Sequence, residues 1–315
     1  MIAPMFSPHY ARTRSGLIHY VEMGTGEPLV LLHQTPSSWD EFRELMPLLA
    51  TRRRVIAPDI IGFGASESIT DHSIERYAEA VLALLDELDL DRVHLLGHQL
   101  GGIVAVEMSH QQPERPGALI LSGTPYVDEV FRRNRPQMHP LSLVELQDDG
   151  RHLMELWVRR SGFYPPARPD LLDRYVRDVL LLEDQAEEGH RAISAYRMEG
   201  RTGYRGQVLC IGASADPISF HQVSRLVERF PQACLEIIEG GMVPLMEQLP
   251  EEVAALVTKF LDETPLSPGP APRGGTAAPR HGTAAPRHGT AAPRGGTAAP
   301  ASGGSADPAH HDEAT

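Results

Sequence analysis

Short apolar runs alternate with amphipathic stretches along residues 1–264. The runs end at or beside Gly, Pro or Asp, which is typical of buried parallel strands. They are RRVIAPDI, DRVHLLGH, GALILSG, GQVLCIG and CLEIIEG, and GLIHYVEMG with EPLVLLHQ predicts a hairpin that leads into the same sheet. Between the runs, SIERYAEAVLALLDELDL and ISFHQVSRLVERF have the spacing of amphipathic helices. This alternation predicts an α/β fold with a mostly parallel central sheet flanked by helices.

One long segment breaks the alternation. Residues 127–202 carry no strand pattern and predict several helices, in LSLVELQDDGRHLMELWVRR and RPDLLDRYVRDVLLLEDQAEEGHRAISAYR. We therefore expect a core made of residues 1–126 and 203–264, with a helical lid inserted after the sixth strand. Such an insertion lies over the ends of the strands, where sites in these sheets form.

The composition changes again over residues 265–315. A seven-residue unit repeats there as GTAAPRH or GTAAPRG, with almost no large apolar residue. Pro and Gly in every unit exclude a helix and therefore a coiled coil. We predict a disordered, extended Gly/Ala/Pro/Arg tail, with a tether to a partner as the alternative.

Composition narrows the classes of partner. The 315 residues carry a net charge of −13, and an acidic body repels the phosphates of nucleic acids. No run is long and apolar enough to span a bilayer and the first residues lack a secretory signal, so no membrane partner and a cytoplasmic location are predicted. Cys210 and Cys234 lie in apolar stretches, which predicts buried free thiols. The sequence has no metal-ligand spacing and no phosphate-binding fingerprint, so we predict neither a metal nor a cofactor. The sequence does not decide whether the protein forms a homo-oligomer.

The stretch LLGHQLGG, residues 95–102, has the order of strand, tight turn and helix. Four further segments stand in a matching order along the chain: LLHQTPSSWDEF, APDIIGFGASE, VLCIGASADPIS and IIEGGMVPLMEQLPEEVAALVTKFL. Together these motifs resemble the α/β-hydrolase superfamily over nearly all of residues 10–264. The resemblance implies an α/β-hydrolase fold, a nucleophile elbow with Gln99 at its apex, an oxyanion loop after the third strand, and the acid of a catalytic triad at Asp216.

Two of the triad positions depart from that family. Its members use Ser, Asp and His in this chain order, whereas Gln99 stands in place of the serine and Met242 in place of the histidine. A neutral amide cannot be ionised to attack a carbonyl, and Asp216 has no imidazole to orient. Removing triad members costs on the order of 10⁶ in rate in serine hydrolases. We therefore expect no hydrolysis by the family mechanism.

The oxyanion hole does not need the serine. The resemblance implies backbone N–H donors at Leu100 and in the HQTP loop, at Thr35 or its neighbour Gln34. The Gln99 amide can add a donor and an acceptor, which suits proton shifts, eliminations and cyclisations. Alternatively, Gln99 only bonds Asp216 across an inactive site. Asp216 is an acid or base if it is unpaired, and structural if it is paired.

Other residues are candidates for the wall of a substrate pocket. Met242 is interpreted as an apolar filler that widens the pocket. Tyr126 follows a strand end, Trp157 lies in the predicted lid, and His33 precedes the oxyanion loop, where the family often has a supporting histidine. His98 is expected to point away from the pocket.

Three functions remain open. The leading hypothesis is a cofactor-free, non-hydrolytic enzyme of secondary metabolism, a cyclase, lyase or isomerase that stabilises an oxyanion on a carbonyl-bearing small molecule. One alternative is an inactive protein that binds a ligand under its lid. The other is a hydrolase that uses a different nucleophile or an activated water.

Overall fold

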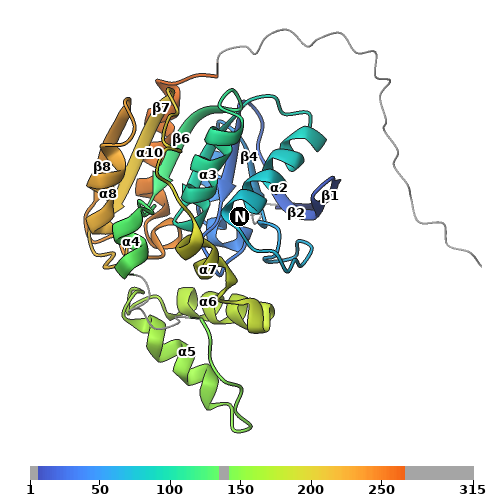
Figure 1. The fold of residues 1–315 in the computed structure, drawn as a ribbon, viewed down its shortest axis with the longest axis vertical. Helices are drawn as coiled ribbons and strands as arrows, with labels where there is room; N and C mark the ends of the chain where they lie inside the picture. The colour runs from blue at the N-terminus through green and yellow to red at the C-terminus, as the bar shows by residue number, and fades with distance from the viewer. Residues whose placement is uncertain (1–5, 135–141, 267–315) are drawn as a thin grey trace, which may run out of the picture. The chain divides into compact units, whose positions relative to one another are not determined.

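An eight-stranded sheet organises the protein (Figure 1). The computed structural model describes residues 6–134 and 142–266. The strand order is β1-β2-β4-β3-β5-β6-β7-β8. The strands are β1 (Ser7–Thr13), β2 (Gly16–Met23), β3 (Pro28–Leu32), β4 (Arg54–Pro58), β5 (Val93–His98), β6 (Pro116–Ser122), β7 (Gln207–Ala213) and β8 (Ala233–Ile238). All pairs from β4 to β8 are parallel, while β2 is antiparallel to β1 and to β4, so the predicted α/β-hydrolase fold is confirmed.

Helices cover both faces of this sheet. The apolar run of β3 alternates, so that Val30 and Leu32 pack on one face and Leu29 and Leu31 on the other. The first face packs against α2 (Ile74–Glu87), α3 (Leu100–Gln111) and α8 (Phe220–Val227). The second packs against α1 (Leu45–Leu49) and α10 (Pro250–Asp262). None of the helices in the described ranges combines the length and apolar character needed to cross a bilayer.

The predicted hairpin was wrong in its pairing. β2 does not pair with β3, because β4 lies between them and bonds to both. The hairpin is instead formed by β1 and β2, which meet at Thr13 and Gly16. β1 was missed because most of its side chains are exposed and carry no buried-strand pattern.

The last strand also corrects the sequence interpretation. Among the described residues β8 pairs with β7 alone and is an edge strand, with Leu235 39% and Ile237 45% exposed. Both cysteines are free, but Cys234 is exposed and only Cys210 is buried. The apolar sequence of β8 predicted that Cys234 is buried, but the position of the strand at the edge of the sheet leaves this residue exposed.

Between β6 and β7 the described residues form helices joined by loops, and none of them forms a strand. The helices are α4 (Glu129–Asn134), α5 (Arg151–Ser161), α6 (Pro169–Leu182), the 3₁₀ turn η3 (Glu183–Gln185) and α7 (Glu188–Ala195). We call this part of the chain the insertion. Its central helices have an apolar cluster of their own, which includes Leu156, Tyr164, Leu171 and Tyr175. The predicted repeat tail lies outside the described residues from residue 267 onward.

Glycines let α3 approach the sheet closely. A Cβ at Gly101 would lie 1.9 Å from the carbonyl oxygen of Leu32, and one at Gly102 would lie 1.8 Å from Thr124 Oγ1. No larger side chain fits either position unless β3 or the loop after β6 moves. The first turn of α3 is therefore fixed directly against β3 and the loop after β6.

Replacing Gly101 with Ala should lower the free energy of unfolding by about 2–3 kcal/mol, because overpacking a tight contact costs about that much. Urea unfolding followed by circular dichroism measures the change. Gly162→Ala is the matched control, since no atom lies within 4 Å of its added Cβ. Equal stability of Gly101→Ala and the wild type would contradict the close approach.

Candidate functional site

Gln99 occupies the apex of a strained turn between β5 and α3. Its backbone has φ 48° and ψ −107°, which residues other than glycine rarely adopt. The Gln99 N–H donates to the carbonyl of Ser122 at 2.9 Å, and the flanking glycines allow the helix to start at once. The turn thus has the geometry of a nucleophile elbow, with an amide side chain at the nucleophile position.

Asp216 lies opposite this apex and is fully paired. It is 2% exposed, and its Oδ1 accepts from the N–H groups of Ile218 at 2.8 Å and Ser219 at 3.2 Å. Its Oδ2 accepts from the Ser219 hydroxyl and from Gln99 Nε2, the latter at 3.4 Å. Of the two alternatives that the sequence left open, the structure shows the paired carboxylate. Residues 117 positions apart are thereby brought together.

Of the three predicted oxyanion N–H donors, that of Gln34 is already engaged, and those of Leu100 and Thr35 stay predictions. Leu100 begins α3, so its N–H has no acceptor within the helix. Thr35 is buried, and its Oγ1 has no hydrogen-bond partner in the described residues. The backbone N–H of Gln34, however, donates to Glu41 Oε2 at 2.7 Å and is therefore occupied. Thr35 also lies directly under α7, since a Cβ at Gly189 would be 2.1 Å from Thr35 Oγ1.

The two histidines near the site hold the backbone in place. His33 Nε2 accepts from the N–H of Ile60 at 2.9 Å, so its Nδ1 carries the proton and donates to the Gln34 carbonyl at 2.6 Å. His98 binds Glu41 through Nδ1 and is 1% exposed. Both rings therefore position the loop after β3 and the strand before the apex, which leaves neither as a ready general base.

The remaining predicted pocket residues have other neighbours. Tyr126 is buried. Arg225 of α8 lies 5.7 Å from its ring centre, and Arg229, which follows that helix, lies 5.0 Å from it. Trp157 packs against the insertion's own apolar cluster. Met242 follows β8, is partly buried, and donates its N–H to Gln248 Oε1 at 2.7 Å. The structure thus joins Gln99 with Asp216 and places Tyr126 and Trp157 in separate packing environments.

Ion pairs fasten α6 of the insertion to the core, a contact that the sequence did not reveal. Arg174 pairs with Glu44 at 2.9 Å and with Glu247 at 3.5 Å, and Arg177 pairs with Asp40 at 2.8 Å. The only sequence signal is the Arg-x-x-Arg spacing, which places both cations on one side of α6. We call this set of pairs the α6 interface.

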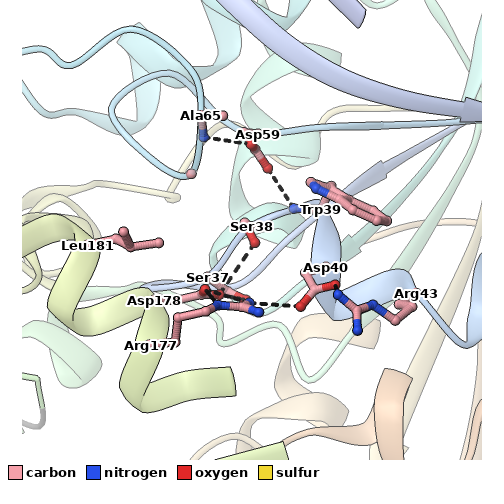
Figure 2. Close-up of a pocket in the computed structure, with 11 residues that line it drawn as sticks. Ser37, Ser38, Trp39, Asp40, Arg43, Asp59, Ala65, Arg177, Asp178 and Leu181 are labelled. Carbon is pink, nitrogen blue, oxygen red and sulfur yellow. Dashed lines mark hydrogen bonds and ion pairs between the residues drawn. The ribbon is translucent and has the colours of Figure 1, made fainter. Parts of the chain in front are cut away.

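A cavity of about 360 Å³ adjoins the α6 interface (Figure 2). Its lining comprises Ser37, Ser38, Trp39, Asp40, Arg43, Asp59, Gly64, Ala65, Arg177, Asp178 and Leu181. Asp59 fastens one wall by accepting from the N–H groups of Trp39 at 2.7 Å and Ala65 at 2.8 Å. The cavity begins two residues beyond Thr35. Among the described residues, no group of three His, Cys, Asp or Glu side chains is arranged to hold a metal ion.

Comparison with known proteins identifies the family. Residues 27–249 match the family model for the alpha/beta hydrolase fold. The chain belongs to this family. It is 34% identical over 292 residues to the haloalkane dehalogenase of Psychrobacter cryohalolentis, an alignment that covers 82% of this chain and 94% of that protein.

Two further similarities are more limited. The 2-hydroxymuconate semialdehyde hydrolase of Pseudomonas sp. (strain CF600) is 35% identical over 132 residues, which is 39% of this chain and 47% of that protein. The chain therefore matches less than half the length of that relative. The enol-lactonase of Burkholderia xenovorans LB400 superposes with a TM-score of 0.69 at 18% identity, covering 81% of this chain and 100% of that chain. This last likeness shows the fold alone.

The α6 interface predicts a dependence of stability on pH. Burial, followed by the Glu41 carboxylate, raises the pKa of Glu247 well above its ordinary value of 4.5. The folded protein therefore holds this proton more tightly than the unfolded chain. Ionisation of Glu247 costs stability as the pH rises above about 4.5 towards the folded pKa.

Glu247→Gln keeps the shape of the side chain and removes its ionisation. We expect the variant to melt at a higher temperature than the wild type at about pH 8, and the two to converge near about pH 4.5. Thermal unfolding across this range measures the difference, with the exposed Glu252→Gln in α10 as the control. If Glu247→Gln melted below the wild type at about pH 8, the pair with Arg174 would outweigh burial.

Proposed function

We propose that this protein is a cofactor-free enzyme that stabilises an oxyanion on a carbonyl-bearing small molecule without forming a covalent adduct. The reaction class is an isomerisation, elimination or cyclisation. The observation that carries the proposal is the strained apex, which presents an amide bonded to Asp216 in place of a nucleophile.

The retained strain supports a working site. A non-glycine residue at such φ and ψ values costs about 1–3 kcal/mol. The turn keeps this strained geometry without a nucleophile, so it can still aim other groups at the site. The N–H of Leu100 is such a group, because the turn places it at the start of α3.

Each residue then has a defined part. The N–H of Leu100 and the β3-loop group at Thr35 would donate to the developing oxyanion, and a single such donor is worth about 3 kcal/mol in serine proteases. Asp216 fixes the Gln99 amide by accepting one of its protons, which orients the remaining amide donor and acceptor. Met242 supplies an apolar surface where an imidazole would otherwise take up a proton.

A hydrolase that relies on another nucleophile or an activated water is the second candidate. The relatives named above carry the names of a dehalogenase and a hydrolase, which favours water as a reactant. Catalysis by water would have to use a base other than His33 or His98, since both hold the backbone.

Restoring the missing triad members tests the leading proposal. The wild type, Gln99→Ser and Gln99→Ser/Met242→His are compared in the hydrolysis of 4-nitrophenyl acetate. We expect the wild type to match the uncatalysed background. The double variant should exceed it by about 100-fold or more, because Ser, His and Asp216 would again act as one unit.

Gln99→Ala/Met242→His is the matched control, since it carries the imidazole and lacks the hydroxyl. Hydrolysis by the wild type at constant specific activity through purification, with ¹⁸O from labelled water in the product, would overturn the leading proposal and support the second candidate. Binding of a carbonyl ligand without turnover would indicate a ligand-binding protein.

A further inference from the structure

The cavity beside the α6 interface lies between two segments that are far apart in the chain. The loop after β3 contributes Ser37, Ser38 and Trp39, and α6 of the insertion contributes Asp178 and Leu181. Figure 2 shows the side chains of α6 on one side of this space and Trp39 on the other. The volume of about 360 Å³ falls within the range of small-molecule sites, which is roughly 300–1,000 Å³. The cavity therefore has room for a small molecule that contacts the core and the insertion at once.

One carboxylate oxygen in the wall of this cavity lacks a close donor. Asp178 is 6% exposed, and its Oδ1 accepts from Arg177 Nε at 3.0 Å and from Arg177 Nη2 at 2.8 Å. Its Oδ2 accepts from the hydroxyls of Ser37 and Ser38 at 3.4 Å each, and no closer donor lies among the described residues. Hydroxyl donors ordinarily lie at about 2.5–3.0 Å from an acceptor. A donor that enters the cavity can therefore improve the hydrogen bonding of a buried carboxylate.

The charges of the wall balance one another. Asp40 pairs with Arg43 and Arg177, and Arg177 also pairs with Asp178, so two carboxylates meet two guanidiniums. The oxygens of the third carboxylate, Asp59, accept backbone N–H groups. Among the described residues, this lining offers no unpaired charge to an anion or a cation. It favours a neutral ligand, because neutral groups can use the remaining donors and acceptors without breaking an ion pair.

The same wall also supplies donors and apolar surface. The side chains of Arg43 and Arg177 are each 45% exposed, and a guanidinium carries more N–H donors than these ion pairs use. Trp39 is partly buried and Leu181 is 67% exposed, so the cavity also has apolar surface on both sides. Acceptors, donors and apolar surface in one small cavity match the hydroxyl groups and C–H faces of a compact polyol.

We propose that this cavity binds a neutral, polyhydroxylated small molecule of about the size of a hexose or a cyclitol. One hydroxyl donates to Asp178 Oδ2, other hydroxyl oxygens accept from Arg43 and Arg177, and a C–H face packs against Trp39. The bound molecule bridges α6 and the loop after β3. The inference is independent of the proposed catalysis, because none of these residues belongs to the apex.

Titration calorimetry with ring compounds of different charge tests the proposal. The polyols are myo-inositol, D-glucose and D-sorbitol, and the comparison compounds are cyclohexanol, cyclohexylammonium and cyclohexanecarboxylate. We expect at least one polyol to bind saturably with a dissociation constant of about 1 mM or lower. The three comparison compounds should bind at least about tenfold more weakly, since they lack the set of hydroxyls or carry a charge.

Two variants locate the binding site. Asp178→Asn should weaken polyol binding about tenfold or more, because the ligand loses a charged acceptor. Asp173→Asn is the matched control, since Asp173 lies on the same helix, is exposed and does not line the cavity. Leu181→Asn should weaken binding about threefold by removing apolar contact, and its exposed position makes it the deciding variant if Asp178→Asn fails to fold.

Three results would overturn the proposal. Absence of saturable binding by all three polyols would show that the cavity holds only water. Tighter binding of cyclohexylammonium or cyclohexanecarboxylate than of any polyol would show a site for an ion. Polyol binding that is unchanged in both Asp178→Asn and Leu181→Asn would place the ligand elsewhere. Failure of the proposed catalysis would leave these binding constants unaffected.

Discussion

The contact between the first turn of α3 and strand β3 is the constraint on which the rest of the site depends. Because Gly101 has no Cβ, the helix begins almost against the Leu32 carbonyl, and the chain must turn within one residue after β5. That residue is Gln99, which is forced into a positive φ. The same contact aims the N–H of Leu100 outward and brings the Gln99 amide to Asp216. Packing thus sets the site geometry whatever side chain stands at the apex.

Glu41 connects the apex to the insertion. One of its oxygens binds His98, the residue before Gln99, and the other binds the N–H of Gln34 in the loop after β3. Its charge also contributes to the raised pKa of Glu247, which Arg174 of α6 contacts. A shift of α6 would therefore change the electrostatic potential at Glu41 and His98, next to Gln99. Buried acids and arginines of this kind cost desolvation energy unless they stay paired. Their pairs between the insertion and the core therefore fix the position of α6 on the core.

Contiguous motifs made most of the core and part of the site predictable. Gln99, Asp216 and the loop after β3 each lie in a short segment whose residue order alone indicates its geometry. The pairing of strands could not be predicted from the sequence in the same way, because the placement of β4 between β2 and β3 depends on contacts between residues far apart in the chain. The exposure of β8 follows from its place at the edge, which its apolar sequence does not reveal. The burial of Arg160 in α5, which is 2% exposed, was missed for the same reason, since an arginine on an amphipathic helix is normally solvated and only tertiary packing buries it.

The central claim is that the apex polarises a carbonyl without bonding to it. Carbon-13 NMR of a small ketone that titration calorimetry shows to bind the protein, labelled at its carbonyl carbon, tests this claim directly with saturating protein. The account predicts a downfield shift that stays in the carbonyl range, because the donors at Leu100 and Thr35 draw electron density towards the oxygen. An upfield move into the range of a tetrahedral carbon would reveal a covalent adduct. That result, or a ketone resonance unchanged by the protein, would contradict the account.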